Sequence, residues 1–177
     1  MSNKQIIIIG GGAAGFFAAI NAAEMNPSAK IIILEKSNKL LAKVRISGGG
    51  RCNVTNHCFD INELVKNYPR GAKELRQVFS RFNVSDTIAW FKKHGVELKT
   101  EPDNRMFPVT DSSETIIDCF MYLTKKHGIE IRMEEEVLSV TPGNQTLNIQ
   151  TSKGSYPANA VIVSSGGHNQ KKNYSFI

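Results

Sequence analysis

The sequence contains little that would mark a secreted or membrane-spanning protein. It has three cysteines in 177 residues, Cys52, Cys58 and Cys119, an odd number without metal-type spacing. This argues against a disulfide scaffold and fits a reducing compartment. The longest apolar run begins at Ile6, but glycines interrupt it after Ile9, and neither a basic segment nor a cleavage site accompanies it. No signal peptide or membrane span is therefore expected, and a cytoplasmic location is predicted.

Strong charge of one sign is also absent. Lysine and arginine total 22 against 16 aspartates and glutamates, a net charge of +6. A positive balance can favour an anionic partner, such as a phosphate-bearing cofactor or nucleic acid. The basic residues are scattered in pairs such as Lys92-Lys93, which more often form a solvated surface. Because His57, His94 and His127 have no partners at ligand spacing, no metal site is predicted.

The first 35 residues predict a βαβ unit. Ile6 to Ile9 are β-branched residues bounded by glycine, as in a strand that a parallel sheet buries on both faces. Alanines, phenylalanines and Ile20 continue as a helix that ends before Pro27, and residues 31–34 repeat the buried strand pattern. The chain is therefore expected to be an α/β protein with a parallel sheet.

The rest of the chain predicts a helical excursion and a small β-meander. Helices are expected between Asp60 and Phe82, after an N-cap at Ser85, and from Asp111 to Lys126, where Glu114 completes a capping box. A strand, a turn and an extended return are expected over residues 96–109. The segments IEIRM, EEVLSVTP, TLNIQTS and SYPANAVIVSS predict a small antiparallel meander, whose last strand, residues 160–163, is buried and returns to the first sheet. Tyr174, Phe176 and Ile177 have no evident packing partner, which favours an N-terminal piece of a longer protein.

Gly10, Gly12 and Gly15 form a G-x-G-x-x-G motif between the first strand and the first helix. In this context the motif binds a dinucleotide, because its backbone approaches the pyrophosphate at a helix N-terminus. Glu35 follows the next strand, where an acid accepts hydrogen bonds from a ribose. This carboxylate also argues against a 2′-phosphate at the same position, since the two negative charges would repel.

A second glycine-rich segment, SGGGRCN, occupies residues 47–53. A simple NAD-linked dehydrogenase needs no such loop, whereas FAD extends farther across the edge of a parallel sheet. Ser47, the amides of residues 48–50 and Asn53 are therefore expected to hold FAD, and Arg51 to supply positive charge to a phosphate or to a reduced flavin. A surface loop without a ligand is the alternative.

Several motifs together resemble a known family. GGGAAG, LEK, ISGGGRCNVTN, RMFPVTDSS and AVIVSSGG look like the N-terminal part of the BaiN/RdsA-type NAD(P)/FAD-dependent oxidoreductases. The resemblance covers nearly all 177 residues. It implies that residues 1–177 are the N-terminal part of a Rossmann-like FAD-binding domain, without the family's inserted and C-terminal segments.

The resemblance also implies a set of cofactor-binding residues. Val137 is expected to contact the adenine through its backbone, and Ser165 and Gly166 to lie beside the pyrophosphate. The full set expected to bind the cofactor is Gly10, Gly12, Ala13, Ala14, Gly15, Glu35, Lys36, Lys43, Ser47, Gly48, Gly49, Gly50, Arg51, Cys52, Asn53, Val137, Ser165 and Gly166.

The predicted function is an FAD-dependent oxidoreductase that passes hydride from NADH or NADPH through the flavin to an acceptor, for instance an activated carbon–carbon double bond. The resemblance implies an unsaturated steroid or a uracil of ribosomal RNA, so the acceptor is either a small molecule or an RNA base. A nucleotide-binding fragment without turnover and an NAD-linked dehydrogenase are the alternatives. A disulfide reductase is disfavoured, because the five residues between Cys52 and Cys58 are one too many for the pattern of those enzymes. No catalytic residue is assigned.

Overall fold

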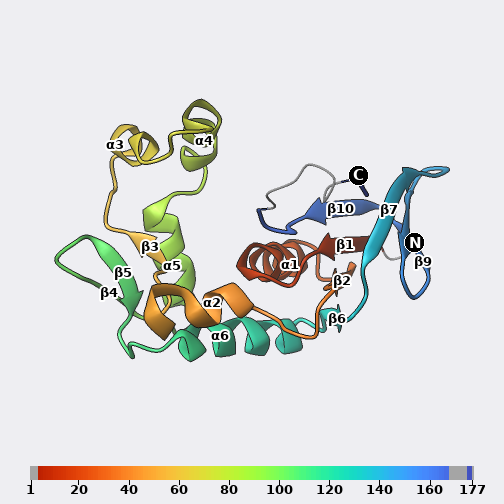
Figure 1. Cartoon of the computed structure of the whole chain (residues 1–177), viewed down its shortest axis with the longest axis horizontal. Coiled ribbons are helices and arrows are strands. Elements are labelled where there is room, and N and C mark those ends of the chain that lie inside the picture. Colours follow the sequence, from red (N-terminus) through yellow and green to blue (C-terminus); the bar gives the residue numbers. More distant parts are fainter. Residues whose placement is uncertain (1–3, 168–174, 177) are drawn as a thin grey trace. The chain divides into compact units, whose positions relative to one another are not determined.

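The computed structural model describes residues 4–167 and 175–176. The chain divides into two compact units (Figure 1). The first unit comprises Met1–Lys43 and Phe120–Ile177, and the second comprises Val44–Cys119. The expected parallel sheet, the βαβ unit and the meander all belong to the first unit, and the expected helical excursion to the second.

A four-stranded parallel sheet in the order β10-β1-β2-β6 forms the centre of the first unit. Its strands are β1 (Gln5–Ile9), β2 (Lys30–Leu34), β6 (Glu130–Arg132) and β10 (Ala160–Val163). Helix α1 (Ala13–Met25) connects β1 to β2 and packs against both. The predicted βαβ unit is therefore confirmed.

The isoleucines of β1 and β2 are buried because both faces of the sheet are covered. Ile7 and Ile8 have no exposed surface. On the helical face, Phe16 of α1 contacts Phe120 of α6 (Ser113–Lys126), with ring centroids 6.0 Å apart. On the opposite face, one cluster joins the sheet to the meander: Ile7, Ile9, Ile32, Leu34, Val137, Ile149 and Ala158.

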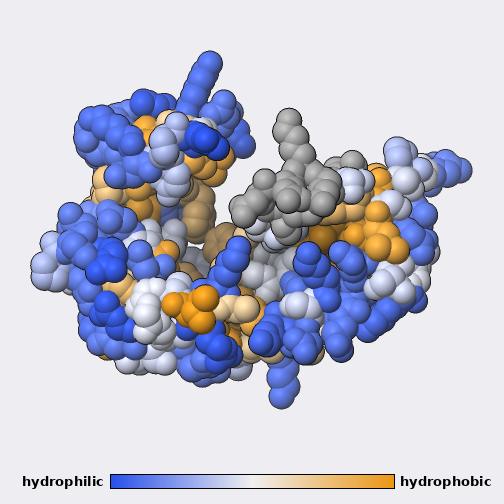
Figure 2. Space-filling model, in the orientation of Figure 1, coloured by the Kyte–Doolittle hydropathy of each residue, from blue (hydrophilic) through white to orange (hydrophobic). Residues whose placement is uncertain are grey.

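The meander consists of β7 (Val137–Pro142), β8 (Leu147–Thr151) and β9 (Ser155–Ala158), paired antiparallel in that order. Its prediction is confirmed for these three strands. The register shifts between Val137 and Ser139, so Leu138 forms a bulge at the start of β7. Figure 2 shows hydrophobic residues on the surface near the meander, where Leu138 is 52% exposed.

Strand β6 was wrongly expected in the meander. It pairs parallel with β2, and Ile131 lies opposite Ile33. The strand follows α6, whose C-terminal half packs on α1, so the chain re-enters the first sheet at its edge. The charges beside Ile131 fit an edge position, because Glu130 pairs with both Lys30, at 3.3 Å, and Arg132.

Strand β10 returns to the first sheet as predicted, but it is not buried. Ile162 is 37% exposed and Val163 is 42% exposed. Among the described residues, β10 pairs with β1 alone, so its apolar side chains lie at the edge of the sheet.

Phe176 does have a packing partner, contrary to the sequence-based expectation. Its ring packs against the cluster between the sheet and the meander, and its carbonyl accepts a 2.7 Å hydrogen bond from the amide of Val140. These contacts are long-range, so no local pattern indicated them. Tyr174 and Ile177 lie outside the described residues.

The second unit contains helices and a small antiparallel sheet. Its helices include most of α2 (Ala42–Ile46), then α3 (Ile61–Lys66), α4 (Ala72–Phe79) and α5 (Val84–Lys93), and the first half of α6. The sheet has the order β3-β5-β4, from β3 (Thr55–Asn56), β4 (Leu98–Thr100) and β5 (Arg105–Pro108). The predicted helices and hairpin are confirmed. Figure 2 shows that hydrophilic residues cover most of the visible surface of α3 and α4.

Two predicted helix caps are wrong by one or two residues. Asn83, not Ser85, caps α5: its side chain accepts from the amide of Ser85, and Asp86 completes a capping box. At α6, Ser112 accepts from the amide of Glu114, while Asp111 has a left-handed backbone and pairs with Lys99 of β4. A more distant partner thus engages the carboxylate that the sequence suggested as a cap.

Within the described part of the chain, no helix has the length and apolar character that crossing a membrane requires. The same residues contain no group of three or more histidines, cysteines, aspartates or glutamates arranged to hold a metal ion.

Candidate nucleotide-binding site

The turn between β1 and α1 presents backbone amides at a helix start. Gly12 is the N-cap of α1, and the first intrahelical hydrogen bond runs from the amide of Phe16 to its carbonyl, at 3.0 Å. No side chain of the described residues caps this helix. The amides of Ala13, Ala14 and Gly15 therefore have no acceptor within the helix and can bind an anion.

Close packing at the third glycine holds this turn in place. A Cβ atom on Gly15 would lie 1.9 Å from the carbonyl oxygen of Gly10, so only glycine fits there. A Cβ atom on Gly12, in contrast, would meet no atom within 4 Å. The backbone at Gly12 is thus open to a ligand that approaches the helix start.

Glu35 lies at the end of β2 and contacts the same turn. Its Oε2 accepts a 2.8 Å hydrogen bond from the amide of Gly11, and its Oε1 accepts one of 2.8 Å from the amide of Ser37. A carboxylate oxygen has two lone pairs, so each can accept a further hydrogen bond. Glu35 is therefore fixed in position and still able to accept hydroxyl groups of a ribose.

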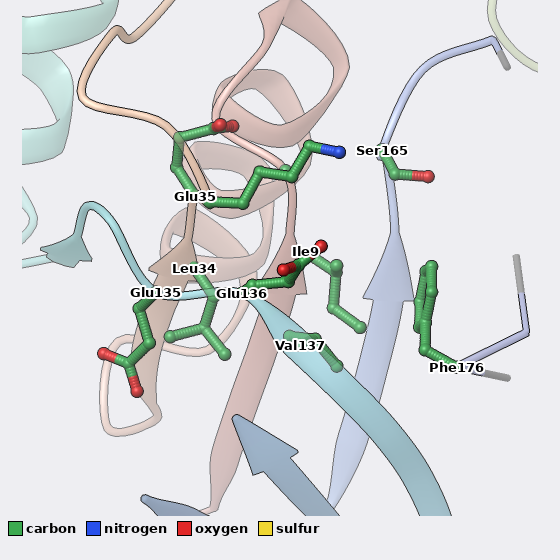
Figure 3. Close-up of a pocket in the computed structure, with 10 residues that line it drawn as sticks. Ile9, Leu34, Glu35, Glu135, Glu136, Val137, Ser165 and Phe176 are labelled. Atoms are coloured by element: carbon green, nitrogen blue, oxygen red, sulfur yellow. The ribbon is translucent and has the colours of Figure 1, made fainter. Parts of the chain in front are cut away.

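A pocket lies at this edge of the sheet (Figure 3). It encloses about 110 Å³, which suits part of a nucleotide and is smaller than the few hundred Å³ typical of a site that buries a whole ligand. Three of its side chains are carboxylates and one is a lysine. The residues that line it are Ile9, Gly10, Leu34, Glu35, Lys36, Glu135, Glu136, Val137, Ser165 and Phe176.

The acidic lining indicates which part of a dinucleotide this pocket would accept. The carboxylates of Glu35 and Glu136 would repel a phosphate, whereas they can accept hydrogen bonds from hydroxyl or amino groups. The ribose and adenine therefore fit the pocket, and the phosphates fit the amides at the start of α1. Val137, which is 8% exposed, lines the pocket, and its contact with the adenine stays a prediction.

Strand β10 brings a third polar segment to this edge. Ser164 donates from its hydroxyl to the carbonyl of Ile9, at 2.9 Å, which ties the end of β10 to the end of β1. Ser165 then lines the pocket, and Figure 3 shows Glu35 and Ser165 on opposite sides of Ile9.

Gly166 has φ +77°, and a Cβ atom there would lie 3.8 Å from Nζ of Lys43. Lys43 thus approaches the segment expected beside the pyrophosphate.

A buried carboxylate connects the strands that border the pocket. Glu135 is 3% exposed, and its Oε1 accepts from the hydroxyls of Thr151, at 2.7 Å, and Tyr156, at 2.6 Å. Its amide donates to the carbonyl of Glu35, at 2.9 Å. The hydrogen bond to Glu135, together with burial, raises the pKa of Tyr156. This network fixes the start of β7 relative to the end of β2.

The second glycine-rich segment belongs to the second unit. Ser47–Gly50 form one turn of 3₁₀-like structure, in which Gly48 has φ +56° and Gly49 has φ +70°. The amide of Cys52 closes the turn on the carbonyl of Ser47, at 3.0 Å, and the Ser47 hydroxyl donates to the carbonyl of Val44. A Cβ atom on Gly49 would meet no atom within 4 Å, so this backbone is open.

The cysteines do not support redox chemistry. Cys52 and Cys58 are both free, and Cys52 is 6% exposed. Burial raises the pKa of the Cys52 thiol, against a smaller opposite effect of its contact with Ser47. Cys52 therefore packs beneath the turn, and a reactive thiolate is disfavoured there.

The predicted site residues form two groups. The first unit brings together Gly10, Gly12, Ala13, Ala14, Gly15, Glu35, Lys36, Lys43, Val137, Ser165 and Gly166. The second unit brings together Ser47, Gly48, Gly49, Gly50, Arg51, Cys52 and Asn53. That one ligand contacts both groups stays a prediction.

Sequence reasoning missed several residues of the pocket. Glu135 and Glu136 are among them, although the acidic run 134–136 just before β7 could have indicated them. Phe176 is another, and nothing near it in the sequence indicated its position.

The chain is similar to curated proteins over nearly its whole length. It is 28% identical to the 3-dehydro-bile acid delta(4,6)-reductase of Clostridium scindens, a match that covers 95% of this chain and 40% of that protein. It is 27% identical to the ribosomal RNA dihydrouridine synthase of Escherichia coli, over 94% of this chain and 40% of that protein. The chain thus spans about 40% of the length of these relatives.

Solved structures show the same fold. An open conformation of a flavocytochrome c3 fumarate reductase matches 97% of this chain and 35% of that chain with a TM-score of 0.69 at 20% identity. CtdE in complex with FAD matches 98% of this chain and 41% of that chain with a TM-score of 0.51 at 17% identity. The model of the HI0933-like protein Rossmann domain matches residues 4–173. Because this model covers nearly the whole chain, the chain belongs to the HI0933-like Rossmann domain family.

Proposed function

We propose that this chain is the FAD-binding part of a flavin-dependent oxidoreductase that uses NADH or NADPH as reductant. One observation carries the proposal: the carboxylate of Glu35 lies beside the open helix start at Gly12. Its Oε2 is 2.8 Å from the amide nitrogen of Gly11. A dinucleotide needs this pair, one element for its phosphates and one for its ribose. The FAD named in the matched CtdE structure supports the choice of cofactor.

The residues of the first unit fit the adenosine half of FAD. Glu35 would accept hydroxyls of the ribose, the wall at Val137 would contact the adenine, and the amides of residues 13–15 would bind the pyrophosphate. Lys43, next to Gly166, would supply positive charge beside the pyrophosphate. When bound, FAD would take a hydride from the reduced nicotinamide and transfer it to an acceptor.

The names of two relatives support an activated carbon–carbon double bond as acceptor. One is a bile acid reductase and the other forms dihydrouridine in ribosomal RNA. The first name denotes a reduction and the second a dihydro product. The acceptor of this protein is therefore proposed to be an activated carbon–carbon double bond in a small molecule or in an RNA base.

The first test is the absorption spectrum of the purified protein after addition of excess FAD and desalting. Flavin bands that survive desalting support the proposal. Gly12→Ala is the informative variant, because its methyl group would meet no protein atom but would occupy the space of a phosphate. Gly154→Ala is the matched control, since its methyl group would make ordinary contact with Tyr156 in the meander. Loss of flavin in G12A alone is expected, and equal retention in both variants contradicts the proposed phosphate site.

One alternative is a nucleotide-binding chain without turnover of its own. The chain spans about 40% of the length of these relatives, and their activities are those of the longer proteins. Reduction of bound FAD by NADH or NADPH, followed by its reoxidation by an added acceptor, separates the two. A protein that binds NADH but leaves FAD in solution would point instead to an NAD-linked dehydrogenase.

A further inference from the structure

We infer that Arg51 is a positioning residue that holds the glycine-rich turn Ser47–Asn53 against the β4–β5 hairpin, and that it is not itself a ligand of the cofactor. The sequence suggested the opposite role, a positive charge for a phosphate or for a reduced flavin. The contacts of Arg51 within the second unit decide between these roles.

The guanidinium of Arg51 is already engaged by carboxylates. It donates through Nη1 to Oε1 of Glu101 and through Nη2 to Oε2 of the same carboxylate, at 3.3 Å. Nη1 also lies 3.5 Å from Oδ1 of Asp111. The forked contact with Glu101 uses the geometry in which arginine and carboxylate bind most strongly.

The charges around Arg51 balance within the cluster. Asp111 also pairs with Lys99 of β4, so two cations face two carboxylates. These contacts raise the pKa of Arg51, chiefly through the hydrogen bond with Glu101, and lower that of Asp111, chiefly through the hydrogen bond with Lys99. Because all four groups are charged and paired with one another, little positive charge is left for a phosphate.

One aromatic ring joins the arginine to the glycines. Phe107 of β5 has no exposed surface, and the Arg51 guanidinium lies over its ring, 4.1 Å from the centroid. A Cβ atom on Gly48 would lie 2.6 Å from Cε1 of the same ring. Arg51 and Gly48 thus both rest on Phe107, and the amide of Val54 continues the contact by donating to the carbonyl of Met106, at 2.9 Å.

The turn has a physical need for such a constraint. Gly48, Gly49 and Gly50 are consecutive residues with left-handed backbone, and glycine has more conformations to lose on folding than any other residue. The hydrogen bond from Cys52 to Ser47 closes the turn but does not attach it to the hairpin. Arg51 adds a side-chain attachment to the backbone hydrogen bond of Val54, so it helps to determine how the open amides of the turn are presented.

The test is hydrogen exchange of the backbone amides of residues 48–54 in the full chain without added cofactor. Arg51→Gln is expected to speed exchange at Cys52 and Val54 about tenfold, as the loss of a charge-assisted hydrogen bond predicts. Arg51→Lys, which keeps one donor and the charge, should restore part of the protection. Arg105→Gln is the matched control, because Arg105 pairs with Asp103 on the same hairpin and lies 5.4 Å from the same ring. It should leave the exchange of these amides unchanged.

A second measurement connects the turn to the cofactor, and this part rests on the function proposed above. Among variants that fold, the Kd for FAD is expected to rise in R51Q and to recover partly in R51K. Faster exchange together with weaker binding supports the positioning role. Weaker binding without faster exchange overturns it, because Arg51 would then contact FAD directly.

Two further outcomes separate this inference from the proposed function. Suppose that neither the unaltered protein nor any variant binds FAD, while R51Q still speeds amide exchange in the turn. The positioning role then stands and the proposed function fails. If R51Q yields no folded protein, Glu101→Gln gives the same test, since it keeps the arginine and removes the charge of its partner. Unchanged exchange in a folded E101Q overturns the inference.

Discussion

The amide of Gly11 donates a 2.8 Å hydrogen bond to Oε2 of Glu35. This contact joins the glycine turn after β1 to the acid after β2, residues that are 24 positions apart. It fixes the carboxylate by a backbone donor, and a second backbone donor, the amide of Ser37, holds its other oxygen. A ligand at this position would therefore meet a carboxylate whose orientation is set before binding.

Glu35→Gln should weaken the binding of ADP and of FAD about tenfold. The amide keeps the shape of the side chain but replaces one charged acceptor by a donor, and a hydrogen bond to a charged group contributes about 1.5 to 3 kcal/mol. Titration calorimetry with ADP measures the change. Glu63→Gln, an exposed position on α3, is the control. Equal affinity of E35Q and the unaltered protein for ADP would place the ribose elsewhere.

Gly15→Ala should destabilise the fold by about 3 kcal/mol, at the upper end of the cost of overpacking. Its methyl carbon would lie 1.9 Å from the carbonyl oxygen of Gly10, and both atoms belong to backbone that packs tightly. The midpoint of urea unfolding measures the effect, with G154A as the variant that should change little. A G15A protein of normal stability would show that α1 can move away from β1 without cost.

The local features of the fold could be predicted from the sequence. The run of isoleucines, the glycines after it and the second apolar run predicted β1, α1, β2 and the glycine turn correctly. Each of these depends on neighbouring residues, because strand burial, helix start and turn geometry leave short-range patterns. The three strands of the meander followed from the same kind of evidence.

Features that depend on distant partners could not be predicted. Strand β6 joins the parallel sheet, where Ile131 pairs with Ile33. Asp111 does not cap α6, and its carboxylate pairs with Lys99 instead. The exposure of Ile162 follows from its edge position. The role of Arg51 depends on Glu101, fifty residues away, and therefore has no signature near the glycines.

Tyr156→Phe should cost about 1 kcal/mol, the usual contribution of a hydrogen bond, because Glu135 would lose one of its two hydroxyl donors. The pKa of Tyr156 is raised in the folded protein, chiefly by the hydrogen bond to Glu135. The stabilisation that this hydrogen bond gives the folded protein is therefore fully present at pH values below the unfolded pKa of about 10. It is lost as the pH rises through the higher pKa of the folded protein.

Urea unfolding of both proteins from about pH 8 to about pH 11 tests this sign. The difference in unfolding free energy between the unaltered protein and Y156F should shrink as the pH increases. A difference that grows with pH would show that the tyrosinate is stabilised next to Arg132, whose guanidinium lies 4.6 Å from the ring centroid.

Among the three free cysteines, Cys58 alone should react rapidly with a thiol reagent in the folded protein near pH 8. Burial raises the pKa of Cys119 to about 11 and also raises that of Cys52, so at this pH both remain protonated as well as shielded. Cys58 is partly exposed, and its thiol donates to the carbonyl of Asp60, at 3.7 Å. Colorimetric thiol counting with and without urea gives the number of fast and slow groups, and Cys58→Ser should remove the fast one. A second fast group that disappears in Cys52→Ser would revive the disulfide-reductase interpretation, because it would place a reactive thiolate inside the glycine-rich turn.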